Sequence, residues 1–160
     1  MATLSDLTLR NRVYMATYRY RTLDPVPFVR FDQPLGEARV ALVTTGAVYA
    51  PGQPPFDETA KGGDVSFREL PLATDLSKLG IAHKSDAFDP TGFAADRNLG
   101  FPLDRLREMS ARGEIGPLNA RHLSFMGSIT APGRLIAETA PKAADLLAAD
   151  GIDVALLVPL

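Results

Sequence analysis

The sequence predicts an α/β domain in which helices flank a mainly parallel sheet. Apolar runs rich in valine, leucine and isoleucine alternate with longer segments of helical periodicity, which is the pattern of strands joined by crossover helices. Two of the runs, 39–45 and 153–160, are continuous rather than alternating, as strands buried on both faces are. We therefore expect a three-layer, Rossmann-like or flavodoxin-like arrangement, with its carboxyl-terminal part missing.

Composition fits one globular domain and excludes several classes of function. The 160 residues include 17 basic and 19 acidic side chains, so no general attraction to nucleic acid or to a membrane surface is expected. The absence of cysteine removes disulfides, thiolate metal ligands and a thiol nucleophile from these residues. No secretory signal and no apolar run of roughly 20 residues is found. The resulting expectation is a cytoplasmic protein.

Residues 1–37 are predicted to form an amino-terminal arm with a proline-rich connector, and residues 38–160 a single α/β domain. Within the arm, tyrosines interleave with arginines over 5–21, where helical periodicity is moderate. Such a mixture is typical of RNA contact through stacking. Because the rest of the chain is not basic, we favour an arm that packs on the domain or on a second subunit. Three prolines in 24–36 predict an extended connector.

The domain is expected to begin with strand 39–45. Thr44, Thr45 and Gly46 then stand at its carboxyl end, where hydroxyl groups and a bare backbone can approach a ligand. Ligands of open α/β sheets bind beyond the carboxyl ends of the strands. These three residues are therefore candidate substrate-binding residues.

The middle of the chain is predicted to contain two long loops and two short strands. Prolines and glycines make 51–64 a loop, and the alternation in 65–70 suits an edge strand. A short strand follows in 78–83, and a second, polar loop in 84–100.

Two helices and two strands complete the predicted order. The first helix opens at Phe101–Asp104, with proline in its first turn, and ends at Gly113. Strand 118–126 is followed by a helix over 130–149, which Pro141 should interrupt because proline has no amide proton. The closing apolar run is then expected to be a central strand.

The two histidines are the candidate catalytic residues. His83 could donate a proton to a leaving amine, since imidazole titrates near neutral pH, or be a locally hydrogen-bonded residue at a strand end. His122 alternates with apolar residues, so it faces either the site or the core. A metal site is not expected, because the histidines would need Asp86, Asp89 or Asp96 as further ligands.

Arg68, Arg97 and Asp86 are further candidate substrate-binding residues in or beside the loops. An arginine can hold a substrate carboxylate through two parallel hydrogen bonds, or it can pin a loop by an ordinary ion pair. Both alternatives stay open. The dinucleotide-binding, phosphate-binding, zinc-protease and serine-hydrolase motifs are absent.

Nine segments together form a recognisable ordered set. They are Val40–Gly46, Pro55–Asp57, Ser66–Glu69, His83, Asp96–Asn98, Phe101–Leu106, Arg121–Gly127, Glu138–Pro141 and Asp150–Leu157. Their order resembles the selenoprotein B family of the glycine, sarcosine, betaine and D-proline reductases, and most nearly the short subunit of the D-proline type. The resemblance covers about residues 38–160 and leaves the arm outside.

The resemblance implies reductive cleavage of a carbon–nitrogen bond in a small amino-acid-like substrate. In the family, a selenocysteine or cysteine follows the strand that corresponds to 154–160, so this redox residue is expected at position 161. An in-frame UGA codon, loss of the redox half or an artificial truncation would explain where the sequence stops. The expected partners are other reductase subunits or a second copy. The alternative is a non-catalytic binding or assembly module that uses the arm as its contact.

Overall fold

The chain forms two compact units, residues 1–32 and 33–160. The structure, a computed structural model, describes residues 5, 7–18, 22–85 and 88–160. The first unit contains helix α1 (Leu9–Thr17), which Thr8 caps by accepting a hydrogen bond from the Asn11 amide, and none of its residues is buried. Among the described residues, no helix is both long and apolar enough to cross a membrane.

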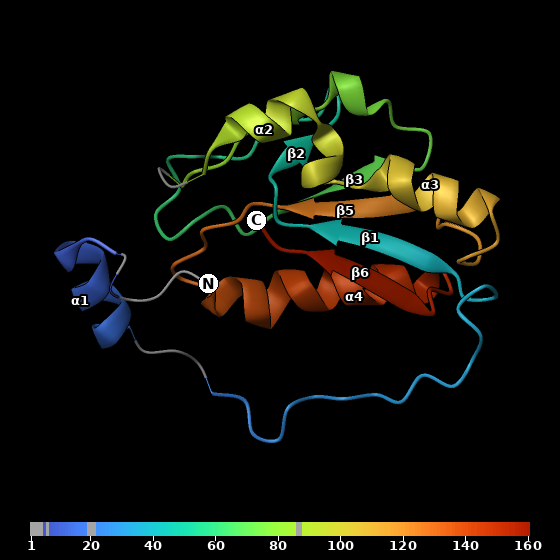
Figure 1. Cartoon of the computed structure of the whole chain (residues 1–160), viewed down its shortest axis with the longest axis horizontal. Coiled ribbons are helices and arrows are strands. Elements are labelled where there is room, and N and C mark those ends of the chain that lie inside the picture. Colours follow the sequence, from blue (N-terminus) through green and yellow to red (C-terminus); the bar gives the residue numbers. More distant parts are fainter. Residues whose placement is uncertain (1–4, 6, 19–21, 86–87) are drawn as a thin grey trace. The chain divides into compact units, whose positions relative to one another are not determined.

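The second unit is a mixed α/β domain built on a four-stranded sheet (Figure 1). The strand order is β3 (Phe67–Pro71), β5 (Arg121–Phe125), β1 (Val40–Thr44), β6 (Val154–Val158). β1 runs parallel to both β5 and β6, while β3 is antiparallel to β5. The predicted α/β class is confirmed with a mixed sheet, in which two of the three strand pairings are parallel, and the edge position of the alternating strand is confirmed as well. A separate two-stranded sheet pairs β2 (Val48–Tyr49) with β4 (Gly80–Ile81).

Within the described residues, strand β6 lies at the edge of the sheet, so the prediction of a central strand was wrong for this part of the chain. Its five residues pair one for one with β1. Leu157, with 68% of its surface exposed, and Leu156, with 39%, are not covered by the described residues. The apolar run did indicate a strand correctly. Its neighbours, however, depend on pairing between distant segments, which a local pattern does not encode.

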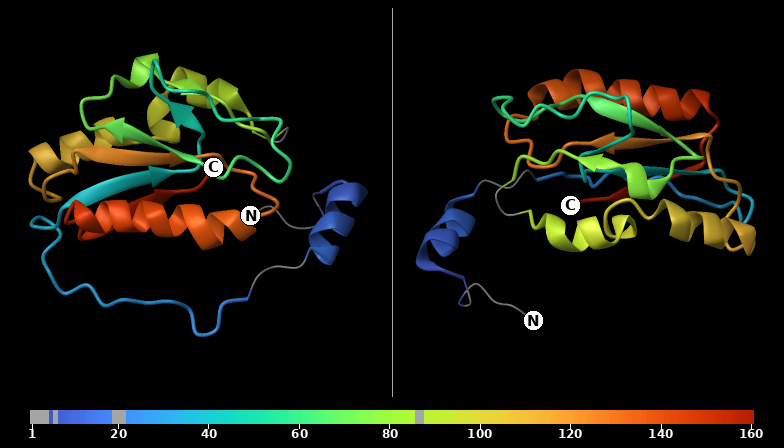
Figure 2. Two further views of the ribbon diagram at one scale, coloured as in Figure 1. Left: turned by 180° about the vertical axis from the view of Figure 1, so that it is seen from behind. Right: turned by 90° about the horizontal axis from the view of Figure 1, so that it is seen from above.

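Helices lie on both faces of the sheet (Figure 2). On one face, α4 (Ala140–Ala149) packs Leu147 against Leu123 of β5. On the other face, α3 (Leu103–Ala111) buries Leu103 against β1. Successive β1 residues point to opposite faces, so Val40 and Leu42 contribute to one apolar cluster and Ala41 and Val43 to the other.

A short helix, α2 (Pro90–Ala95), occupies part of the stretch 84–100 that was predicted to be a loop. Asp89 caps it by accepting a hydrogen bond from the Thr91 amide, and proline fits the first turn. A single 3₁₀ turn, Arg97–Leu99, follows. The capping signal was present in the sequence, but the helix is too short to show periodicity.

The helix before β6 is interrupted as predicted. A π-helical turn, Leu135–Thr139, precedes α4, and Pro141 lies in the first turn of α4. Proline cannot donate a hydrogen bond to the preceding turn, and a π turn accommodates the mismatch.

Candidate functional site

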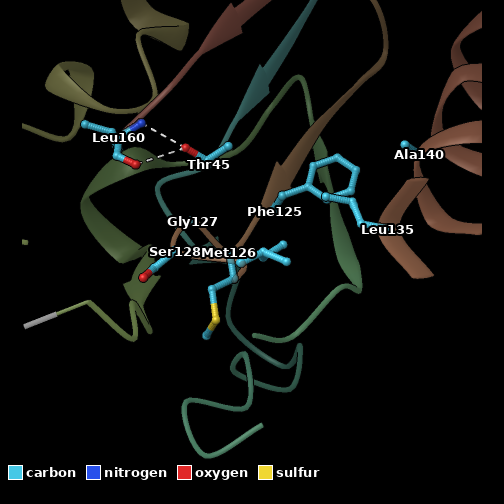
Figure 3. Close-up of a pocket in the computed structure, with 9 residues that line it drawn as sticks. Thr45, Phe125, Met126, Gly127, Ser128, Leu135, Ala140 and Leu160 are labelled. Atoms are coloured by element: carbon cyan, nitrogen blue, oxygen red, sulfur yellow. Dashed lines mark hydrogen bonds between the residues drawn. The ribbon is translucent and has the colours of Figure 1, made fainter. Parts of the chain in front are cut away.

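Three strand ends meet at one edge of the sheet. β1 pairs in parallel with both β5 and β6, so the carboxyl ends of the three strands lie at the same edge of the sheet. Thr45 follows β1, and its hydroxyl accepts a hydrogen bond from the Leu160 amide at 2.8 Å. The same hydroxyl donates to the Leu160 carbonyl oxygen at 3.3 Å (Figure 3). This pair of hydrogen bonds fixes the last residue of the chain against the end of β1.

Gly127 lies where these strand ends come closest to His83. A Cβ atom at this position would lie 2.5 Å from His83 Nε2, 3.0 Å from the Leu160 carbonyl oxygen and 3.1 Å from the Thr45 carbonyl oxygen. Side-chain atoms do not approach that closely without displacing their neighbours. The missing side chain therefore leaves room for the imidazole to reach the end of β6.

His83 is held in one orientation by its own neighbours. Nδ1 accepts a hydrogen bond from the Ser85 amide at 3.2 Å, and the ring stacks on Phe88 with centroids 4.3 Å apart. Because Nδ1 is an acceptor, the neutral ring carries its proton on Nε2. Nε2 is buried and has no hydrogen-bond partner among the described residues. An unpaired donor thus lies at the junction of the strand ends.

Burial keeps this histidine neutral. It lowers the pKa of His83 below the ordinary value of 6.5, and the charge of Glu58 opposes the shift only in part. Protonation of Nδ1 would also place two donors face to face at Ser85. His83 is therefore suited to donate a hydrogen bond from Nε2 to a negatively charged group.

A cavity of about 360 Å³ opens beside this edge, on the α4 side (Figure 3). Its apolar wall includes Met126, Ile129, Leu135 and Ala140. Thr45, Gly127, Ser128 and Leu160 form the other part of its lining. An apolar cavity with a few polar groups at one end is the usual form of a small-molecule site.

Two non-glycine residues with a left-handed backbone follow the strand ends. Ala47 has a φ of 51° and Ser128 a φ of 58°. Such a conformation costs on the order of 1–2 kcal/mol and tends to occur at functional sites. The Ala47 amide donates to the Phe125 carbonyl at 2.9 Å and its carbonyl accepts from the Ala82 amide at 3.0 Å, and these bonds hold the strained turn.

Thr44 and Gly46 have different surroundings from Thr45. Thr44 is fully buried, and its hydroxyl donates to the Gly100 carbonyl at 2.5 Å and accepts from the Gly46 amide at 3.0 Å. A Cβ at Gly46 would lie 2.7 Å from Leu160 Cδ1. Of the three predicted ligand-binding residues, Thr45 alone lines the cavity.

His122 lies inside the sheet rather than at its edge. Val40 and Val43 of β1 are three residues apart, whereas their partners Leu118 and Leu123 are five apart, so the ladder contains a bulge. The His122 side chain fills the gap, because its Nδ1 accepts the hydrogen bond of the Leu42 amide at 3.0 Å. The side chain is fully buried. This geometry corresponds to the core alternative for His122.

The two predicted arginines bind main-chain carbonyls. Arg68 donates from Nε to Pro54 at 2.8 Å and from Nη2 to Pro55 at 3.0 Å, which pins the proline-rich loop. Arg97 donates to the Phe93 carbonyl at 2.5 Å. Neither lines the cavity at the strand ends. Their proposed role in binding a substrate carboxylate stays a prediction.

Asp86 lies outside the described residues. Within the described part of the chain, no group of three or more metal-ligating side chains is placed to hold an ion. Asp89 and Asp96 instead cap the two short helical turns.

The sequence interpretation did not select Gly127 as a candidate site residue. The rule that selected Thr45 at the end of β1 applies equally at the end of β5 and would have selected Gly127. Its proximity to His83 had no signal in the sequence, because the two are far apart along the chain.

Comparison with known proteins identifies the family. Residues 7–159 match the glycine/sarcosine/betaine reductase selenoprotein B family. The chain belongs to this family. The match to selenoprotein B also includes most of the arm, so the expectation that the resemblance begins near residue 38 was wrong.

Curated relatives within the selenoprotein B family carry the names of reductase subunits. D-proline reductase subunit gamma of Acetoanaerobium sticklandii is 29% identical over 154 residues, which are 96% of this chain and 61% of the relative. Glycine reductase complex component B subunit gamma of Peptoclostridium acidaminophilum is 27% identical over 151 residues, 93% of this chain and 34% of the relative. The chain thus spans about three-fifths or one-third of these relatives. No solved structure matches.

Proposed function

We propose that this chain is a subunit, or part of one, of a reductase complex that reductively cleaves a carbon–nitrogen bond in a small amino-acid-like substrate. Membership of the selenoprotein B family and the names of the relatives support the proposal. The observation that carries it is the junction at which His83 Nε2 and the Leu160 carbonyl oxygen both approach Gly127. The end of β6 is where the family resemblance leads us to expect a selenocysteine or cysteine.

A selenolate or thiolate directly after Leu160 would supply the nucleophile for the reduction. The residues of this chain would position it and stabilise its charge. Thr45 holds the Leu160 main chain through two hydrogen bonds. His83, neutral and protonated on Nε2, presents a buried donor to the same place. A fixed hydrogen-bond donor favours an anion and lowers the pKa of the thiol or selenol.

The proposed role of His83 differs from proton transfer to a leaving amine, which the sequence led us to expect. A neutral imidazole whose Nδ1 is already an acceptor is a poor acid at Nε2. Transfer of a proton would first require Nδ1 to be protonated and its hydrogen bond from Ser85 to break. Anion stabilisation needs neither change. We therefore propose that His83 stabilises an anion by donating a hydrogen bond. Its transfer of a proton to a leaving amine stays an untested prediction.

The gene itself provides the first test. A UGA codon after codon 160, followed in frame by a nearby cysteine codon and further structured sequence, supports the reductase. A UAA codon followed by unrelated sequence would contradict it.

A chain extended along its reading frame, with cysteine at position 161, tests the site without requiring turnover. The thiol pKa is measured from the pH dependence of its alkylation rate. We expect H83F to raise this pKa, while H83Q, whose amide can donate from nearly the same place, should stay close to the parent. Equal thiol pKa values in all three proteins would refute the role of His83.

The second candidate function is a non-catalytic binding or assembly module. It is favoured by the exposed apolar side chains of the arm, of which Phe28 is 84% and Val29 89% exposed. Reductant-dependent turnover of amino-acid substrates by the extended chain separates the two functions. Absence of turnover across the glycine, sarcosine, betaine and D-proline panel would favour the module.

The cytoplasmic location and the Rossmann-like or flavodoxin-like class belong to the same proposal. Helices on both faces of a mainly parallel sheet support the fold class. Cell fractionation with an antibody to the chain tests the location.

A further inference from the structure

The connector of the arm is an exposed apolar segment with unused hydrogen-bonding groups. Val26 is 73%, Phe28 84% and Val29 89% exposed. Within the described residues 22–32, the chain is neither helix nor strand and makes no backbone hydrogen bond. Clustered large apolar side chains in water are unfavourable and typically mark an interaction site. We call residues 26–31 the connector segment.

The body of the chain carries an apolar groove between α4 and β6. Its volume is about 430 Å³. Lining residues include Ala140, Ala144, Ala148, Ile152, Ala155 and Leu157. The alanines of α4 leave space above the sheet, and Leu157 is the most exposed large side chain of β6. The groove therefore has room for bulky apolar side chains.

The units that carry the connector segment and the groove also differ in net charge. Residues 1–32 contain five arginines and three aspartates, a net charge of +2. Residues 33–160 contain twelve basic and sixteen acidic side chains, a net charge of −4. Asp153 lies in the lining of the groove itself. Opposite net charge steers two surfaces together and favours this pairing over association of two bodies or two arms.

We propose that the connector segment of one copy binds in the α4–β6 groove of a second copy, and that the exchange is reciprocal. Each copy supplies one segment and one groove, so a two-fold arrangement closes without leaving either exposed. Phe28 and Val29 are the bulky side chains that would fill the space above the alanines. The inference does not depend on the proposed reductase function, since it concerns assembly alone.

Because the sequence contains no cysteine, any disulfide must join the cysteines that are introduced for the test. V29C is introduced into one copy and A144C into another copy with a larger tag, and the two are mixed and mildly oxidised. We expect a disulfide-linked pair of unequal copies on a non-reducing gel. A94C, which places the thiol at an exposed alanine of α2 on the other face of the sheet, is the matched control and should not cross-link with V29C.

Sedimentation velocity of the unmodified chain over a range of concentrations should show a monomer–dimer equilibrium. The double variant F28S/V29S is expected to weaken dimerisation by at least about tenfold, because interface energy concentrates in a few buried apolar side chains. L99S removes a side chain that is 60% exposed elsewhere on the body and should leave the equilibrium unchanged.

Three results would overturn the proposal. The first is a monomer at every concentration. The second is a disulfide that forms only within single chains of a V29C/A144C double variant. The third is loss of the cross-link when the chain is extended along its reading frame, which would show that the following segment of the same chain fills the groove.

Discussion

The unfolding free energy of the domain should fall steeply between pH 7 and pH 4 because of His122. Burial, with a smaller contribution from the charge of Arg107, lowers the pKa of His122 from 6.5 to about 4. Protonation of Nδ1 would also remove the acceptor of the Leu42 amide, a bond of 3.0 Å. His122 therefore binds a proton more weakly in the folded state than in the unfolded chain.

The direction and size of the effect follow from linkage. Between about pH 6.5 and about pH 4 the unfolded chain binds up to one more proton than the folded domain, so the stability is fully present above that range and declines as the pH falls through it. Each pKa unit corresponds to about 1.36 kcal/mol. With a folded-state pKa of about 4, the loss between pH 7.5 and pH 5 is about 2 kcal/mol, and it approaches about 3.4 kcal/mol well below pH 4.

The assay is urea unfolding of the wild type and of H122N at several pH values. Asparagine keeps an oxygen near the position of Nδ1 that can accept the hydrogen bond from the Leu42 amide, but it does not titrate. Its smaller volume costs stability equally at every pH, so only the slopes are compared. The unfolding free energy lost between pH 7.5 and pH 5 should be smaller in H122N by about 2 kcal/mol, which is the loss calculated for His122 in the wild type. Equal slopes in the two proteins would refute the reasoning.

Three further substitutions test the site and its support. G127A should push the partly buried His83 ring out of its position, which moves its pKa back towards the ordinary value. NMR titration of the ring measures this, and an unchanged pKa would contradict the close approach of 2.5 Å between a Cβ at residue 127 and His83 Nε2. T45V removes both hydrogen bonds to Leu160 with little change of shape and should cost about 1 kcal/mol in urea unfolding, with faster exchange of the Leu160 amide; unaltered exchange would count against this contact. R121A breaks partly exposed ion pairs with a glutamate and an aspartate, so we expect a loss below about 1 kcal/mol that shrinks in high salt, and a larger, salt-independent loss would indicate a packing role instead.

The elements of the fold were predictable where local chemistry decides them. The apolar run that forms β1 and the interruption at Pro141 were predicted correctly, because burial and the missing amide of proline act locally. Helix α2 was missed because its six residues are too few to show the repeating apolar spacing by which a helix is recognised in a sequence. The edge position of β6 depends on which strands pair, and pairing joins segments far apart in sequence.

The site shows the same division. Sequence alone located the strand ends and so selected Thr45, and it supplied both histidines as candidates. Only the tertiary structure separated them. His122 completes a ladder of the sheet, whereas His83 reaches the end of β6 beside Gly127. The physical reason is that alternation determines which face a side chain occupies, whereas the distance between two side chains depends on how non-adjacent strands pair and how closely a glycine lets them approach.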